Sequence, residues 1–168
     1  MKKLFSIMIL TFLLTACSLF INPVSMPENM PDDFDFSIKF GFDKKNEINT
    51  YDGTVTKDLI MDGTATATIT FIHEEKQNIY DRMKEINITE TKKLTPKLTD
   101  RTCFQEPHED DEWKITINGE TYKHSISGEY CHPTDDAKEL IELRNEIFRM
   151  VEGKKAYQDL PEARGGYD

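Results

Sequence analysis

Residues 34–42 read FDFSIKFGF, and this stretch decides the fold. Large apolar side chains occupy every second position from Phe34 to Phe42, with small or polar residues such as Asp35 and Lys39 between them. Successive side chains of an extended strand point to opposite faces. The stretch therefore predicts a β-strand with one face in the core and one in water.

Two turn signals follow this strand, Asp52-Gly53 and Asp62-Gly63. Asp-Gly pairs favour hairpin turns, because type I′ turns need positive φ at both central residues. The next stretch, TATATITFI at 64–72, alternates again, and its small alanines indicate that something packs closely over that face. We expect a hairpin and a further strand here.

Two segments have helical periodicity. The first, His73 to Asn87, begins with acids, which the helix dipole favours in the first turn. The second begins with Thr134 or Asp135 as its cap and ends at Gly153. Its expected apolar stripe consists of Ala137, Leu140, Ile141, Ile147, Phe148 and Val151, widened by Leu143 and Met150.

The clearest hairpin is WKITINGETYKHSI at 113–126, with its turn at Asn118-Gly119. This turn fixes which residues face one another. The expected pairs are Ile117 with Glu120, Ile115 with Tyr122, and Trp113 with His124. Between the first helix and this hairpin, residues 88–112 predict extended segments and a loop.

Together these elements predict an α+β fold. We expect an antiparallel sheet of about five to seven strands with two helices packed on it, most simply on one face. A hairpin precedes each helix, so a duplicated β-β-α unit is also possible. The expected organisation is a single domain over 34–160 and a mobile tail over 161–168.

The N-terminus has the order of a secretory signal peptide. Lys2 and Lys3 precede an apolar run that is shorter than the roughly 20 residues of a membrane-spanning helix, and the order Leu14-Thr15-Ala16-Cys17 resembles the bacterial lipobox. The resemblance implies cleavage of residues 1–16 and a lipid on the sulfur of Cys17. Residues 17–33 would then be a flexible tether with three prolines. The alternatives are an ordinary signal peptide with a chance cysteine, or a retained N-terminal anchor.

If Cys17 is lipidated, Cys103 and Cys131 remain as a pair. An even pair outside the cytoplasm favours a disulfide bond, and two free buried thiols are the alternative. Neither cysteine belongs to a C-x-x-C pair, so a zinc site of the usual kind is less favoured.

The charge balance limits the partners. Loss of Lys2 and Lys3 makes the net charge of -10 two units more negative. Nucleic acid and anionic lipid surfaces are therefore poor partners, whereas a cationic protein, a peptide or a metal ion is less excluded. The acidity can also serve only to keep the domain soluble.

The densest candidate for chemistry is the acidic segment 106–112. Its carboxylates, with Asp110 and Asp111 at the centre, could hold a cation, and His108 and His132 could share a zinc site across the disulfide. No EF-hand frame, G-x-S-x-G, H-E-x-x-H or phosphate-binding loop is present. We therefore expect no catalytic residue and no cofactor.

The chain also resembles the small uncharacterised lipoproteins of Firmicutes such as Bacillus. The resemblance rests on LLTAC, YDGTVT, WKITINGETY and the terminal LPEARGGYD. It implies a location on the outer side of the cell membrane and no particular activity. The sequence thus favours a non-enzymatic, membrane-anchored domain that binds an envelope protein or peptide, and no nucleic acid. A metal-binding or metal-dependent enzyme module using 106–112 with His108 and His132 is the alternative.

Overall fold

The computed structural model describes residues 25–167, which form one antiparallel sheet with helices on it. The strands are β1 (Asp35–Gly41), β2 (Asn46–Asn49), β3 (Thr54–Asp58), β4 (Thr64–Thr68), β5 (Asp110–Ile117) and β6 (Glu120–Ser127). The helices are α1 (His73–Glu85), α2 (Asp135–Glu152) and the short α3 (Lys155–Gln158), with a 3-10 turn η1 (Phe42–Lys44) after β1.

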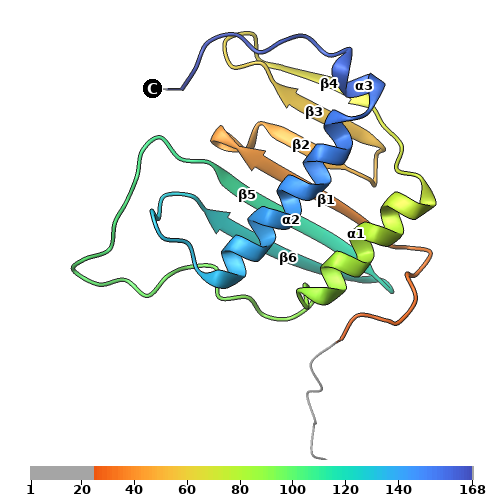
Figure 1. The fold of residues 1–168 in the computed structure, drawn as a ribbon, viewed down its shortest axis with the longest axis horizontal. Coiled ribbons are helices and arrows are strands. Elements are labelled where there is room, and N and C mark those ends of the chain that lie inside the picture. Colours follow the sequence, from red (N-terminus) through yellow and green to blue (C-terminus); the bar gives the residue numbers. More distant parts are fainter. Residues whose placement is uncertain (1–24, 168) are drawn as a thin grey trace, which may run out of the picture.

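The sheet has six strands in the order β4-β3-β2-β1-β5-β6. The first four strands form a meander, α1 returns the chain, and the β5–β6 hairpin adds on the other side of β1 (Figure 1). Helices α1 and α2 lie on the same face of the sheet, joined by hydrogen bonds from Arg82 to Glu146. The predicted α+β class, strand number and two packed helices are confirmed.

Each edge of the sheet is a hairpin followed directly by a helix: β3–β4 leads into α1, and β5–β6 leads into α2. This is the order that suggested a duplicated unit, and the duplication itself stays a prediction. The central strands β1 and β2 precede both units in the chain.

β1 follows the alternation from which it was predicted. Phe34, Phe36, Ile38 and Phe40 are buried against the helices. Gly41 has a positive φ of 88° and ends the alternation, so Phe42 leaves the core row and enters η1. The expectation that Phe42 continues the buried face was therefore wrong.

The β5–β6 hairpin has the predicted register, with Ile117, Ile115 and Trp113 opposite Glu120, Tyr122 and His124. Asn118 and Gly119 both have positive φ, as a type I′ turn requires. At the two Asp-Gly turns only Gly53 and Gly63 have positive φ, so those turns are of another type.

The core lies between the sheet and the two long helices. Trp113, Ile115 and the inward residues of β1 meet Tyr80 and Met83 of α1. α2 begins as predicted, with the Thr134 side chain accepting a hydrogen bond from the Ala137 amide at 3.2 Å. Its fully buried residues are Ala137, Leu140, Leu143, Ile147 and Val151, whereas Ile141 and Phe148 are half-buried at the side of this stripe.

Contacts of the domain extend to both ends of the described chain. Met26 is buried, and the Tyr80 hydroxyl donates to the Pro27 carbonyl at 2.7 Å, so the packed part begins ahead of Phe34. In the segment expected to be a mobile tail, Arg164 pairs with Asp62 and the Tyr167 ring stacks on Phe42.

Candidate functional site

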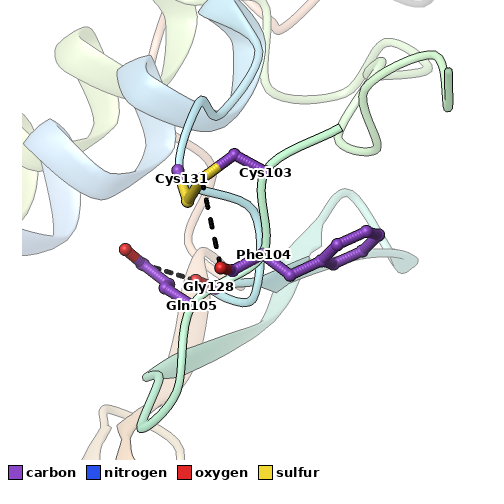
Figure 2. The surroundings of a disulfide bond; sticks show 5 residues. All are labelled: Cys103, Phe104, Gln105, Gly128 and Cys131. Carbon is purple, nitrogen blue, oxygen red and sulfur yellow. Dashed lines mark hydrogen bonds between the residues drawn. A yellow bond between two sulfur atoms is a disulfide. The ribbon is translucent and has the colours of Figure 1, made fainter. Parts of the chain in front are cut away.

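The two cysteines are joined as predicted. Cys103 and Cys131 form a disulfide with 5.4 Å between their Cα atoms. The bond connects the loop before β5 to the segment leading into α2 (Figure 2). Beside it the Cys131 amide donates to the Cys103 carbonyl at 3.2 Å, and Phe104 and Tyr130 form an isolated antiparallel bridge. The disulfide therefore reinforces a very short pairing of two loop segments.

The acidic segment 106–112 lies beside this disulfide but does not gather the proposed metal ligands. His108 contacts two carboxylates, Glu106 at 3.2 Å and Asp110 at 3.6 Å. Within residues 25–167, His132 is exposed and has no hydrogen bond or ion pair with them. In the same part of the chain, no group of three or more His, Cys, Asp or Glu residues is arranged to hold a metal ion.

Asp111 points into the molecule instead of joining this group. It is 3% exposed, and its Oδ2 lies 3.3 Å from Nε of Arg144 on α2. The two atoms are close but poorly aligned, so the contact is an ion pair without a good hydrogen bond. Burial raises the pKa of Asp111 to about 6, against the lowering effect of Arg144. The guanidinium also lies 5.1 Å from the centre of the Phe40 ring.

A different set of polar side chains gathers on the face of the sheet away from α1 and α2. A hollow of about 350 Å³ lies on this uncovered face, over β1, β2, β5 and β6. Its lining residues are Ser37, Lys39, Glu47, Asn49, Tyr51, Asp52, Glu112, Lys114 and Lys123. We call this region the sheet hollow.

The strand register arranges the sheet hollow in rows across the strands. In one row Lys39 of β1 lies between Glu47 of β2 and Glu112 of β5. In the next row Lys114 of β5 is the direct partner of Lys123 of β6. One row therefore alternates in charge, and the other places two like charges side by side.

Tyr51 forms the rim of the hollow at the β2–β3 turn. Its hydroxyl lies 2.8 Å from the Thr116 hydroxyl, and its ring centre lies 4.2 Å from the Lys114 ammonium. Burial raises the pKa of the Tyr51 phenol above its ordinary value. A cation over an aromatic face is attracted by the ring quadrupole, so Tyr51 holds Lys114 at the hollow.

The lysines of the sheet hollow are the groups left available for a ligand. Among the described residues, Lys39, Lys114 and Lys123 have no carboxylate within ion-pair distance. Glu112, by contrast, pairs with Lys44 at 3.8 Å. Like charges directly opposite in a sheet are destabilising, so the Lys114–Lys123 pair is a cost that an anionic group would relieve.

The local sequence patterns did not indicate that β1 lies beside β5. That pairing brings Lys39 and Ser37 to the same hollow. Arg144 was also missed. A signal for it existed, because Asp111 shares the inward face of β5 with Trp113, and a carboxylate on a core face needs a cationic partner.

Cys17, the signal peptide and most of the predicted tether lie outside the described residues. In residues 25–167 no helix has the length and apolar character needed to cross a membrane. Comparison with protein families, curated proteins and solved structures found no match to this chain.

Proposed function

We propose that this protein is a non-enzymatic binding domain, lipid-anchored on the outer side of the cell membrane, whose sheet hollow binds an acidic segment of an envelope protein. The observation that carries the binding site is the pair Lys114 and Lys123, directly opposite each other and without an ion-pair partner in the described residues. An uncovered sheet face does not need two adjacent lysines for stability, because their repulsion opposes folding.

The shape and polarity of the hollow fit an extended peptide. It is open, polar and lined from four neighbouring strands, so a chain segment can lie across the rows. Its end at Glu47 and Glu112 carries acids around one lysine, and its other end carries the adjacent Lys114 and Lys123, with Asp52 on the neighbouring turn. A peptide bound here would place a carboxylate between these two lysines.

The proposed location rests on the N-terminal sequence and the cysteines. A short basic start, an apolar run and small residues before Cys17 are the features of lipoprotein processing. The pair Cys103–Cys131 is typical of an oxidising compartment outside the cytoplasm. The metal-dependent alternative is not carried forward, because Asp111 faces Arg144 and the described residues contain no group of three or more His, Cys, Asp or Glu arranged to hold a metal ion.

A peptide-binding experiment tests the site. The lipid-anchored full chain is presented on vesicles to peptides rich in Glu and to matched peptides with Gln at the same positions. We expect binding of the acidic peptides only, and its loss in Lys114→Glu and Lys123→Glu. Lys138 is an exposed lysine on α2, so Lys138→Glu is the charge-matched control and should bind as wild type. Equal binding of both peptide sets, or equal loss in all three variants, would refute the site.

A second experiment tests the anchor separately. Cells expressing the chain are fed an alkyne-tagged fatty acid, and incorporation is compared between wild type and Cys17→Ser. We expect label in wild type only, together with a mass that corresponds to loss of residues 1–16. Equal labelling of the two proteins would overturn the lipid anchor and leave the binding experiment unaffected.

A further inference from the structure

The two edges of the sheet differ in what lies beside them. At the β4 edge, α3 contacts the strand, and Arg164 of the C-terminal segment bonds to the backbone of the β3–β4 turn at Leu59 and Met61. At the β6 edge, a groove of about 390 Å³ lies between the strand and the loop at 89–94 (Figure 1). We call it the edge groove. It is the place where the described structure leaves room beside an edge strand.

The edge groove runs along the backbone of β6. Its strand wall consists of the consecutive residues 121–125. Side chains of consecutive strand residues point alternately to the two faces of a sheet. His124 is buried on the helix side, whereas Lys123 is exposed on the side of the sheet hollow. A groove that contacts residues of both kinds lies along the edge of the strand, where the backbone is their common surface.

The tight turn of the hairpin fixes which backbone groups of β6 face the groove. The turn at 118–119 makes Ile117 and Glu120 the first hydrogen-bonded pair. Bonded and non-bonded pairs alternate from there along the ladder. The residues whose N–H and C=O groups point away from β5 are therefore Thr121, Lys123 and Ser125. Within residues 25–167, these groups have no hydrogen bond to a segment outside the hairpin.

The loop beside the groove is held on the helix side of β6. The His124 Nε2 lies 2.6 Å from the Ile88 carbonyl, and the Lys93 amide donates to the Asp136 carboxylate at 2.6 Å. Leu94 packs against the core. The loop therefore forms a side wall and leaves the backbone edge of β6 uncovered. A strand added beside β6 would have one face over this wall and the other face in water.

The position of Lys123 defines the charge that an added strand should carry. Lys123 is directly opposite Lys114, and among the described residues neither has a carboxylate within ion-pair distance. Opposite charges on neighbouring strands stabilise a sheet, whereas like charges destabilise it. An acidic residue beside Lys123 would therefore stabilise the row. A second copy of β6, paired about Lys123, would instead place two lysines opposite each other.

We propose that the edge groove binds an extended acidic segment of a partner protein, which pairs antiparallel with β6 as an added strand and places a carboxylate beside Lys123. In strand addition of this kind, backbone hydrogen bonds supply affinity and the side-chain positions supply specificity. The backbone pairing goes beyond the sheet hollow and stands without it. Only the choice of an acid beside Lys123 rests on the proposed function.

N-methylated peptides test the pairing on the lipid-anchored full chain presented on vesicles. The probe is the labelled peptide Thr-Thr-Val-Glu-Val-Thr-Thr. With its Glu beside Lys123, the Glu N–H faces β6 and the N–H groups of both Val face away, because bonded positions alternate. Methylation of the Glu nitrogen should weaken binding by about tenfold or more, since it removes a backbone hydrogen bond and adds a clash. Methylation of both Val nitrogens should leave binding within about twofold. Equal effects of the two methylations would overturn the pairing.

A change in the peptide's charge separates the two parts of the proposal. Replacement of its Glu by Gln should weaken binding to wild type but not to Lys123→Gln. If the Glu and Gln peptides bind wild type equally while the contrast between the methylated peptides persists, the acid preference is overturned and the backbone pairing is supported.

A variant of the strand tests the same pairing from the protein side. Ser125→Pro removes an N–H that faces the groove without removing a bond to β5, and edge strands tolerate proline at such positions. Ser125→Ala, which keeps the N–H, is the matched control. We expect Ser125→Ala to bind the Glu peptide as wild type and Ser125→Pro to lose binding, with circular dichroism native in both. Equal binding by the two natively folded variants would overturn the pairing. If Ser125→Pro does not fold, the methylated peptides decide alone.

Discussion

Removal of the disulfide should destabilise the domain by an amount that follows from the length of the loop that the bond closes. Cys103 and Cys131 are 28 positions apart. The loop-closure relation gives an entropy of about 12 cal/mol/K for a loop of this length, or about 3.5 kcal/mol at 25 °C. The free energy of unfolding of a small domain is about 5–15 kcal/mol, so this bond contributes a large share of the stability. We expect Cys103→Ser with Cys131→Ser to lower the free energy of unfolding by about 3.5 kcal/mol.

Urea unfolding measures this loss directly. Trp113 is the single tryptophan and is buried, so its fluorescence reports the core, and circular dichroism reports the sheet. The double variant should unfold at lower urea with a steeper dependence, because its unfolded chain exposes more surface. Wild type kept reduced should unfold as the double variant does. A natively folded double variant within about 1 kcal/mol of oxidised wild type would refute the chain-entropy reasoning.

Three further predictions concern single positions. Burial raises the folded-state pKa of Asp111 from 3.8 to about 6, so between these pH values the folded chain binds a proton that the unfolded chain has lost. The free energy of unfolding should therefore fall as the pH rises from 3.8 to about 6. In Asp111→Asn the urea midpoint should depend less on pH over this range. Gly128→Ala should lower the melting temperature, because its Cβ would collide with the Glu109 carbonyl, whereas Gly166→Ala, with open space around it, should not. Tyr80→Phe should lose about 1 kcal/mol in urea unfolding, because its hydroxyl bonds the backbone of the N-terminal segment.

The parts of the fold predicted from the sequence are those that local patterns determine. Alternation over 34–42 identified β1, and Asn118-Gly119 fixed the β5–β6 register, because a tight turn leaves one way to pair its strands. The helix from Asp135 was likewise marked by its cap and stripe. Each of these signals lies within a single element or hairpin.

What could not be predicted depends on contacts between distant segments. No local pattern indicates that β1 pairs with β5, so the row that places Lys39 between Glu47 and Glu112 could not be predicted. Residues 88–112 predicted extended segments and a loop without fixing where they change, and β5 begins at Asp110 inside the acidic run. The carboxylate of Asp111 is buried there because Arg144 on α2 pairs with it, whereas composition alone would place this carboxylate in water.

The described N-terminal segment shows at which end of the sheet the chain enters the domain. The Asp33 carboxylate accepts from the Asn118 amide at 2.9 Å, so the chain enters the domain at the β5–β6 turn. The disulfide lies at the other end of these strands, where β5 begins and β6 ends. β5 has 8 residues and spans about 25 Å. Under the proposed anchoring, the tether would therefore join the domain at its turn end, opposite the disulfide.

The charges at the turn end are consistent with the proposal that a protein, and not lipid, occupies the sheet hollow. Exposed carboxylates mark the turn end, namely Asp32, Asp52 and Glu120. They repel an anionic membrane surface within about a Debye length, close to 8 Å at physiological salt. Lys114 and Lys123 lie farther along the strands from the turn than Glu120, so anionic headgroups that approach from the turn end would meet these carboxylates first. Their charge is then available to an acidic segment that approaches from the side or from the disulfide end.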